Sequence, residues 1–229
     1  MKKMISRVGD EIYQGIAHAL FHFKSRKKKF IDIYRRNGFG GQESLSGPGS
    51  GIEQTQAVRE ALPEIVREYH IRSFVDAPCG DFHWMGKVAL EVDKYIGIDI
   101  VPDLIKINRQ KYGSVNREFH ALDIVVDKLP SADLIMSRDC FIHLSFRDIR
   151  SALRNFQRAG YKYILTTTFP GSTSNVDILT GRVRVINLQK PPFSFPKPLL
   201  VVNERCAEAG GSFADKSLAL WTLPDIEVN

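Results

Sequence analysis

Residues 71–84, Ile-Arg-Ser-Phe-Val-Asp-Ala-Pro-Cys-Gly-Asp-Phe-His-Trp, contain the pattern that decides the fold. The apolar run at 73–75 predicts a short strand that ends on Asp76, and a tight Pro-Cys-Gly-Asp turn at 78–81 follows it. Apolar residues then recur at helical spacing, at Phe82, Trp84, Met85 and Val88. The predicted order is therefore strand, turn, helix. Such a turn directs backbone N–H groups and a helix N-terminus at a ligand, and Gly80 has no side chain to keep the ligand away.

A second strand with an acid at its end follows at the expected distance. Tyr95-Ile96-Gly97-Ile98 is an apolar run that leads into Asp99. In nucleotide-binding βαβ units, an acid about 20 residues after the glycine turn holds the ribose hydroxyls. Asp99 is therefore predicted to contact a ribose.

On these residues the chain resembles the class I S-adenosylmethionine (SAM) dependent methyltransferases. The first motif of that family is acid-x-Gly-x-Gly, and the residues here are Asp76, Ala77, Pro78, Cys79 and Gly80. Proline replaces the first glycine. Because proline fixes φ and has no N–H, we expect a stiffer turn that lacks one backbone contact to the cofactor.

The resemblance covers roughly residues 52–222, with Asp99, Asp123 and Asp133 following in register. It implies a Rossmann-like α/β fold, with a seven-stranded, mostly parallel sheet and helices on both faces. The last strand is expected to insert antiparallel. A helical extension with a loop, residues 1–51, precedes this methyltransferase domain of residues 52–229.

The resemblance also implies SAM as the cofactor. The residues expected to contact it are Asp76, Ala77, Pro78, Gly80, Asp81, Trp84, Asp99, Ile100, Asp123, Ile124, Ser137 and Arg138. Two of them have alternative roles. Asp81 either receives the ammonium group of the cofactor or caps a helix, and Asp123 either lies near the adenine or caps a turn.

The remaining elements follow from apolar spacing and from helix-end signals. Helices are predicted at 52–69, with a kink at Pro63, at 102–113 and at 145–160. Further strands are predicted at 117–121, 132–137, 163–168, 199–203 and 217–222. The Pro-Phe-rich segment 191–198 is predicted to be an extended loop.

Length and composition set broad limits. A chain of 229 residues is most simply one domain with an extension. No run of 18 apolar residues is present, so neither a membrane span nor a secretory signal is expected, and the default location is cytoplasmic. The three cysteines, Cys79, Cys140 and Cys206, have no metal-ligand spacing and are expected to be buried, unreactive thiols.

The net charge of +6 arises from the N-terminal part of the chain, and the remainder is neutral. Residues 1–45 contain ten Lys/Arg and four Asp/Glu, and the densest run is Lys24 to Lys29. This run is either a solvated helix end or a contact for nucleic acid, acidic lipid or a polyanionic glycan.

The segment before that run predicts an amphipathic helix. Apolar residues recur at an i, i+4 spacing, at Ile5, Val8, Ile12, Ile16, Leu20 and Phe23. The helix is expected to pack on the domain or on a second copy of the chain as a homodimer, with a membrane-surface role as the alternative. It is predicted to continue to a stop at Asn37-Gly38.

Residues 37–51 are rich in Gly and Ser, which is typical of a linker. Phe39, Glu43 and Leu45 are poor choices for a pure spacer. The segment also resembles a loop of methyltransferases associated with polysaccharide and glycan synthesis, which have a Gly-Glu-Ser-x-Ser-Gly-x-Gly-Ser pattern. We therefore expect a lid over the cofactor or the acceptor.

Methyl transfer to a hydroxyl requires a base, and two candidates follow the strand at 132–137. Asp139 is the preferred general base, and its alternative role is a salt bridge with Arg138. His143 is the second candidate, with packing as its alternative role. Their spacing of four also lets the acid orient the imidazole. A divalent metal at this pair is a further alternative that no neighbouring cluster of acids supports.

A long insert between the fifth and sixth strands is the last candidate site. Arg182, Arg184, Lys190, Phe193 and Phe195 suit recognition of a sugar or its acidic groups, and packing of a long loop is the alternative.

The predicted activity is transfer of a methyl group from SAM to a sugar hydroxyl of a glycan or polysaccharide. An RNA methyltransferase is the alternative that the basic arm favours. Base-methylating enzymes carry an Asn/Asp-Pro-Pro-aromatic tetrad at the fourth strand, whereas this chain has Ser137-Arg138-Asp139-Cys140, so nucleic acid is disfavoured. A small-molecule methyltransferase and a non-catalytic SAM-binding module remain as further alternatives.

Overall fold

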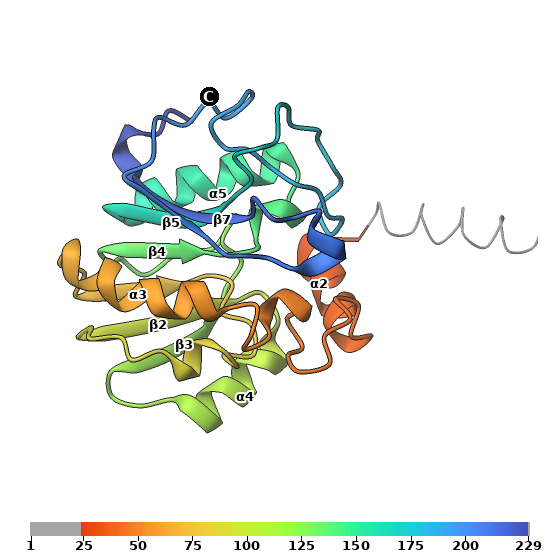
Figure 1. Ribbon diagram of the computed structural model, residues 1–229. Coiled ribbons are helices and arrows are strands. Elements are labelled where there is room, and N and C mark those ends of the chain that lie inside the picture. Colours follow the sequence, from red (N-terminus) through yellow and green to blue (C-terminus); the bar gives the residue numbers. More distant parts are fainter. Residues whose placement is uncertain (1–23, 229) are drawn as a thin grey trace, which may run out of the picture.

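The computed structural model describes residues 24–228. Seven strands form one sheet in the order β3-β2-β1-β4-β5-β7-β6 (Figure 1). The strands are β1 (Ser73–Asp76), β2 (Lys94–Asp99), β3 (Arg117–Ala121), β4 (Leu134–Ser137), β5 (Tyr163–Thr168), β6 (Leu200–Asn203) and β7 (Ser217–Thr222). The amphipathic helix predicted over residues 5–23 lies outside the described part of the chain.

All neighbouring strands pair parallel except at β7. This strand lies between β5 and β6 and runs antiparallel to both, with Ile164 opposite Trp221 and Val201 opposite Ala219. The seven-stranded, mostly parallel sheet with an antiparallel last strand is thus confirmed. In such a sheet the carboxyl ends of the parallel strands β1, β2, β3, β4 and β5 meet at one edge, where ligands bind.

Helices cover both faces of the sheet (Figure 1). The long helices are α2 (Arg26–Arg35), α3 (Gln56–Glu68), α4 (Pro102–Tyr112) and α5 (Phe146–Ala159). The predicted end signals of α5 are confirmed, since Ser145 Oγ accepts the N–H of Asp148 at 3.2 Å and Gly160 takes a left-handed φ of 81°. Pro102 begins α4 and Gly113 follows its end, also as predicted.

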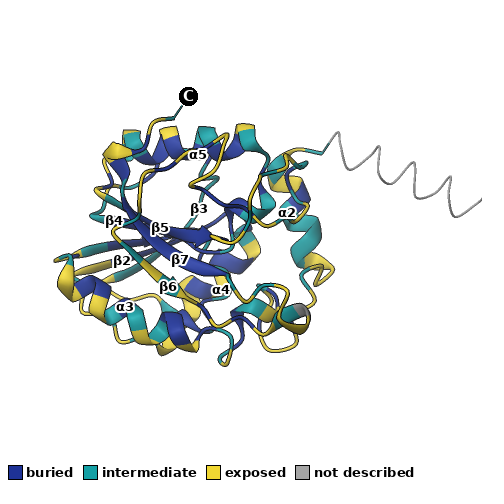
Figure 2. Cartoon of the chain, turned by 45° about the horizontal axis from the view of Figure 1, so that its top comes forward, coloured by how far each residue is buried: buried dark blue, intermediate teal, exposed yellow. Residues whose placement is uncertain are grey.

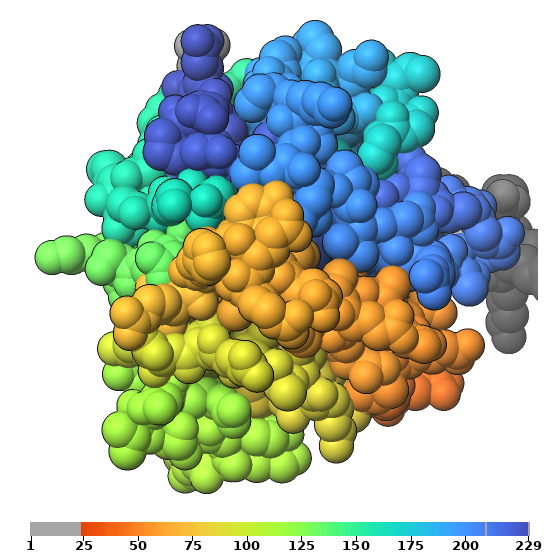
Figure 3. Space-filling view, turned by 60° about the vertical axis from the view of Figure 1, so that its left-hand side comes forward, coloured from red at the N-terminus to blue at the C-terminus, as the bar shows by residue number. Residues whose placement is uncertain are grey.

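Two apolar cores separate the helices from the sheet (Figure 2). On one face α5 packs Ile149, Leu153 and Phe156 against the strands. On the other face α3 and α4 bury their apolar sides, and α3 also reaches the β6 edge (Figure 3). The central strands β1, β4 and β5 are buried on both faces, which explains their continuous apolar sequences.

The prediction of a helix after the glycine turn is wrong. Only a single 3-10 turn, Met85–Lys87, occurs between β1 and β2. Phe82 adopts a left-handed φ of 58°, and its ring packs on Tyr95 and Phe119 at centroid distances of 5.3 and 5.2 Å. Because an α-helix cannot continue through a residue with that backbone conformation, apolar spacing in this stretch reflects aromatic packing instead.

The insert between β5 and β6 is an extended loop, as predicted, but its aromatic side chains are unavailable to an acceptor. Phe193 and Phe195 are buried, and Phe195 packs edge-on against Trp221 at 5.3 Å. The guanidinium of Arg184 donates to the backbone carbonyls of Phe141 and Leu144 at 2.7 and 3.0 Å. Of the two alternatives for these three residues, the structure shows the second, packing of the long loop on the domain.

Candidate functional site

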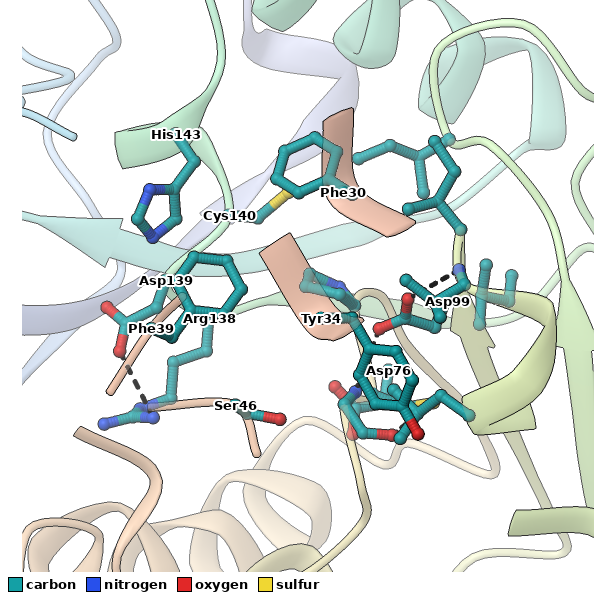
Figure 4. Close-up of a pocket in the computed structure, with 18 of the residues that line it drawn as sticks. Phe30, Tyr34, Phe39, Ser46, Asp76, Asp99, Arg138, Asp139, Cys140 and His143 are labelled. Atoms are coloured by element: carbon teal, nitrogen blue, oxygen red, sulfur yellow. Dashed lines mark hydrogen bonds and ion pairs between the residues drawn. The ribbon is translucent and has the colours of Figure 1, made fainter. Parts of the chain in front are cut away.

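A pocket lies beyond the carboxyl ends of β1, β2 and β4, where the topology predicts a ligand (Figure 4). Its cavity volume is about 150 Å³. Helix α2 and the loop 37–51 form its roof, so the lid expected from the sequence does line this pocket. The predicted domain boundary at 51/52 stays a prediction.

The side chains of Asp76 and Asp99 line the pocket floor at the ends of β1 and β2 (Figure 4). Asp76 is 2% exposed and accepts a hydrogen bond from Tyr95 Oη at 2.6 Å. Burial raises the pKa of Asp76 to about 7 and that of Asp99 to about 6. Each oxygen of Asp99 accepts one backbone N–H, from Val101 at 2.9 Å and from Gly80 at 3.2 Å. A carboxylate offers about four acceptor positions, so Asp99 keeps acceptor capacity for a ribose hydroxyl.

The backbone N–H groups of the glycine turn form hydrogen bonds with the protein itself, including the lid. Cys79 N donates to Ile98 O at 2.8 Å, Gly80 N to Asp99, and Asp81 N to Ser46 Oγ at 3.3 Å. Gly80 has a φ of 52°, and a Cβ there would lie 2.1 Å from Ser46 Oγ. Glycine is thus required at position 80 by both its backbone conformation and the close approach of the lid.

Asp81 holds the lid rather than facing the pocket. Its carboxylate accepts from Ser44 Oγ at 2.9 Å and from Leu45 N at 2.9 Å, and it also accepts the N–H of His83. A second contact lies nearby, where His83 Nε2 is 3.0 Å from Glu43 Oε1. The structure therefore places Asp81 in a role that neither of its predicted alternatives included.

Asp123 is tied to helix α2. Its carboxylate accepts from Arg26 Nε at 2.9 Å and pairs with the terminal nitrogen at 2.8 Å, while Arg26 also pairs with Asp148 of α5 at 3.1 Å. Lys24 pairs with Asp32 at 2.7 Å, and Lys29 is buried. The basic run is therefore only partly a solvated surface, because Arg26 and Lys29 belong to the interface between α2 and the domain.

A buried network of four charged side chains lies at the other end of the pocket. Arg138 donates to Glu204 at 2.6 Å and to the carbonyl of Gly49 in the lid at 2.8 Å, and it lies 3.3 Å from Asp139. Lys216 Nζ is 2.6 Å from Asp139 and 3.4 Å from Glu204. The side chains of Arg138, Glu204 and Lys216 are at most 6% exposed. Two cations and two anions thus neutralise each other in a desolvated cluster.

This network makes Asp139 a weak base. Lys216 and Arg138 lower the pKa of Asp139 to about 2, against the effect of burial. Asp139 also takes a left-handed φ of 51°, and its N–H donates to Thr167 Oγ1 at 2.8 Å. Its predicted alternative role, a salt bridge with Arg138, is present.

His143 is set up differently at the same end of the pocket (Figure 4). Its Nδ1 lies 3.0 Å from the carbonyl oxygen of Arg182. Because a carbonyl only accepts, Nδ1 carries the proton and Nε2 of the neutral ring has a free lone pair. Burial lowers the pKa of His143, so the ring is neutral at pH 7. The Arg182 carbonyl therefore orients the imidazole, a role that the sequence had offered to Asp139.

The pocket contains eleven of the fourteen residues predicted from the sequence: Asp76, Pro78, Gly80, Trp84, Asp99, Ile100, Asp123, Ile124, Arg138, Asp139 and His143. Ala77, Asp81 and Ser137 are not among its lining residues. Sequence reasoning missed the α2 residues Arg26, Phe30 and Tyr34, whose i, i+4, i+8 spacing was the available signal. It also missed Glu204 and Lys216, for which the sequence gives no local signal.

The thiols and the described acids offer no metal site. Cys79, Cys140 and Cys206 are all buried, as predicted, and burial raises the pKa of Cys140 to about 12. Within residues 24–228, no three His, Cys, Asp or Glu side chains are arranged to hold a metal ion. No helix of this described part is long and apolar enough to cross a membrane.

Comparison with solved structures aligns this chain with several methyltransferases. Human N-acetylserotonin methyltransferase in complex with SAM aligns over 86% of this chain and 59% of its own, with 13% identity and a TM-score of 0.55. N-methyltransferase NodS from Bradyrhizobium japonicum WM9 aligns over 73% of this chain and 92% of its own, with 16% identity and a TM-score of 0.49. Magnesium protoporphyrin IX methyltransferase from Synechocystis PCC 6803 aligns over 64% and 73%, with 14% identity and a TM-score of 0.49.

No family model matches the sequence, and no curated protein matches it. The alignment with the human enzyme therefore shows a common Rossmann-like fold, and the fold class predicted from residues 71–99 is confirmed.

The raised pKa of Asp76 predicts a pH-dependent stability. The folded state holds this proton up to about pH 7, whereas the unfolded chain releases it near pH 4. Wild-type stability therefore falls between those values, and Asp76→Asn removes this loss. We compare the free energies of unfolding of Asp76→Asn and of wild type by urea denaturation. The difference, variant minus wild type, should rise by roughly 2–4 kcal/mol from about pH 4 to about pH 8. Parallel pH profiles of the two proteins would contradict a pKa near 7.

Removal of one cation from the buried network predicts a large loss of stability. Lys216→Met leaves Asp139 and Glu204 with Arg138 as their remaining partner, so a buried negative charge is uncompensated. The free energy of unfolding should fall by roughly 3 kcal/mol, the cost of breaking a buried ion pair. The matched control is Lys162→Met, an exposed lysine next to β5, which should change stability by less than about 0.5 kcal/mol. Equal effects of the two substitutions would show that the network is not stabilising.

Proposed function

We propose that this chain is a SAM-dependent methyltransferase that methylates a hydroxyl, and that the acceptor is a sugar of a glycan or polysaccharide. The observation that carries the proposal is one pocket with two different ends. The Asp99 carboxylate lies at one end with acceptor capacity left for a ribose hydroxyl, and the neutral imidazole of His143 lies at the other. The shared fold with a structure that contains SAM supports the choice of cofactor.

The pocket residues fit an adenosyl group. Asp99 is placed to accept the ribose hydroxyls, and the apolar side chains of Ile100, Leu122 and Ile124 line the adjoining wall. Phe30 and Tyr34 of α2 line the same pocket (Figure 4). When bound, SAM supplies a methyl group on a positively charged sulfur, already activated for displacement. The chain itself then has to align the acceptor and remove its proton.

We assign the role of general base to His143. Its Nε2 has a lone pair in the pocket, and its lowered pKa keeps that lone pair free at pH 7. Asp139 has a pKa of about 2 and would take a proton poorly. Its ionised carboxylate is instead a hydrogen-bond acceptor for a second hydroxyl of the acceptor.

A base of this kind favours a hydroxyl acceptor over an amine. A neutral amine is a nucleophile without assistance, whereas a hydroxyl reacts only after its proton is removed. Phe39 of the lid packs against His143 with ring centroids 5.1 Å apart and offers an apolar surface to one face of a sugar ring. The resemblance of the loop 37–51 to glycan-associated methyltransferases supports the same acceptor.

The proposed cofactor site predicts binding that depends on Asp99. Calorimetric titration of wild type should show micromolar affinity for SAM and for its demethylated product. Asp99→Ala should weaken both by roughly 1–3 kcal/mol, because two charge-assisted hydrogen bonds are lost. The control Asp93→Ala removes an exposed acid at the opposite end of β2 and should bind as wild type does. Failure of the wild type to bind SAM would refute the proposed function.

The proposed base predicts a loss in the chemical step alone. With tritiated SAM and a panel of mono- and oligosaccharides, His143→Ala should lower kcat by about 10²–10⁴, with SAM affinity within twofold of wild type. The wild-type rate should rise with pH below about 6.5 and then level, since burial lowers the pKa of the base. His120→Ala, an exposed control on β3, should keep the wild-type rate. Transfer to amines but not to sugars would eliminate the proposed acceptor and leave the cofactor assignment intact.

A further inference from the structure

Four arginines form a stripe along the outer side of α5. They are Arg147, Arg150, Arg154 and Arg158. Their i, i+3, i+7 and i+11 spacing places them on one side of the helix over roughly 16 Å, opposite the side that enters the core. The Arg147 side chain is 88% exposed, and Arg154 and Arg158 are also exposed. Figure 2 shows the alternating buried and exposed bands along α5.

The tertiary structure adds part of α2 to this stripe. Arg26 pairs with Asp148 at the start of α5, and Lys29 lies close enough to Arg147 for their charges to interact. Lys27 and Lys28 of the same run are exposed. Arg26 thus joins two helices that lie more than 100 residues apart in the sequence. We call the other cations of the two helices the basic face: Lys27, Lys28, Arg147, Arg150, Arg154 and Arg158.

Carboxylates of residues 24–228 offset part of this charge. Lys28 Nζ lies 3.9 Å from Asp32 Oδ1. Asp148 is 5% exposed and is engaged by Arg26, although it also lies 3.6 Å from Arg147. Asp127 accepts the backbone N–H of Asp123. The exposed acids Asp225 and Glu227 follow the far end of the stripe, where Gln157 donates to the carbonyl of Ile226. Lys27, Arg150 and Arg154 form no ion pair with a carboxylate of residues 24–228, so these three cations contribute most of the excess positive charge.

We propose that the basic face docks on an anionic membrane surface. Clustered Lys and Arg side chains attract anionic lipid headgroups, and the attraction adds up over neighbouring charges. The sequence before α2 favours a lipid over a soluble polyanion. Apolar residues recur at an i, i+4 spacing from Ile5 to Phe23 and lead directly into the basic run. An apolar stripe next to basic residues is typical of a segment that binds a membrane interface.

The proposal is independent of methyl transfer, since its readout is binding alone. The full chain should co-sediment with vesicles of phosphatidylcholine that contain about 30 mol% phosphatidylglycerol, and not with phosphatidylcholine alone. Binding should fall steeply as salt rises from about 0.05 to 0.5 M, because the attraction is screened. The variant with Arg147→Gln, Arg150→Gln, Arg154→Gln and Arg158→Gln should bind the anionic vesicles at least tenfold more weakly.

A matched control removes the same charge from the other side of the sheet. The substitutions Arg67→Gln, Lys87→Gln, Lys106→Gln and Lys111→Gln change four exposed cations on or near α3 and α4. This variant should bind the vesicles as wild type does, and both variants should keep the wild-type melting temperature within a few degrees. Equal losses in the two variants would overturn the proposal, since net charge and not the basic face would then govern binding. Binding to heparin or RNA with none to anionic vesicles would likewise overturn it, in favour of a soluble polyanion.

Discussion

The guanidinium of Arg138 joins the parts of the chain on which the site depends. It lies at the end of β4, pairs with Glu204 after β6, and donates to the lid at Gly49. Lys216, just before β7, completes the cluster through Asp139 and Glu204. An unpaired charge in this environment would cost several kcal/mol. The lid, the last two strands and the fourth strand are therefore held in one arrangement by mutual neutralisation.

The same pocket keeps four ionisable groups in different protonation states. Asp76 and Asp99 lie on the floor, where no cation of residues 24–228 forms an ion pair with them, and burial raises the pKa of both. Asp139 lies beside two cations, and its pKa falls to about 2. His143 is desolvated and bonded to a carbonyl, so it stays neutral. The surroundings of each group set its pKa, so the Asp139 carboxylate can accept hydrogen bonds while the His143 imidazole can accept a proton.

The N-terminal part of the described chain is a structural component of the pocket. Arg26 holds α2 to Asp123 and Asp148, and Asp81 holds the loop 37–51 through Ser44 and Leu45. Two acids that the family resemblance assigned to the cofactor are thus engaged with the roof. The consequence is a pocket whose access depends on how α2 and the lid are held.

Local sequence determined the elements and the edge of the sheet at which the site lies. Strand bounds such as 117–121 and 163–168, the caps of α5 and the acids after β1 and β2 follow from neighbouring residues, because periodicity and capping act over a few positions. Only the tertiary structure decided three features. Phe82 packs in an aromatic cluster where the sequence predicted the start of a helix, and Phe193 and Phe195 are buried. The tertiary structure also paired Arg138 and Asp139 with Glu204 and Lys216, which lie 65 to 78 positions away along the chain. Such pairings depend on contacts made after the sheet has closed, and no local pattern encodes them.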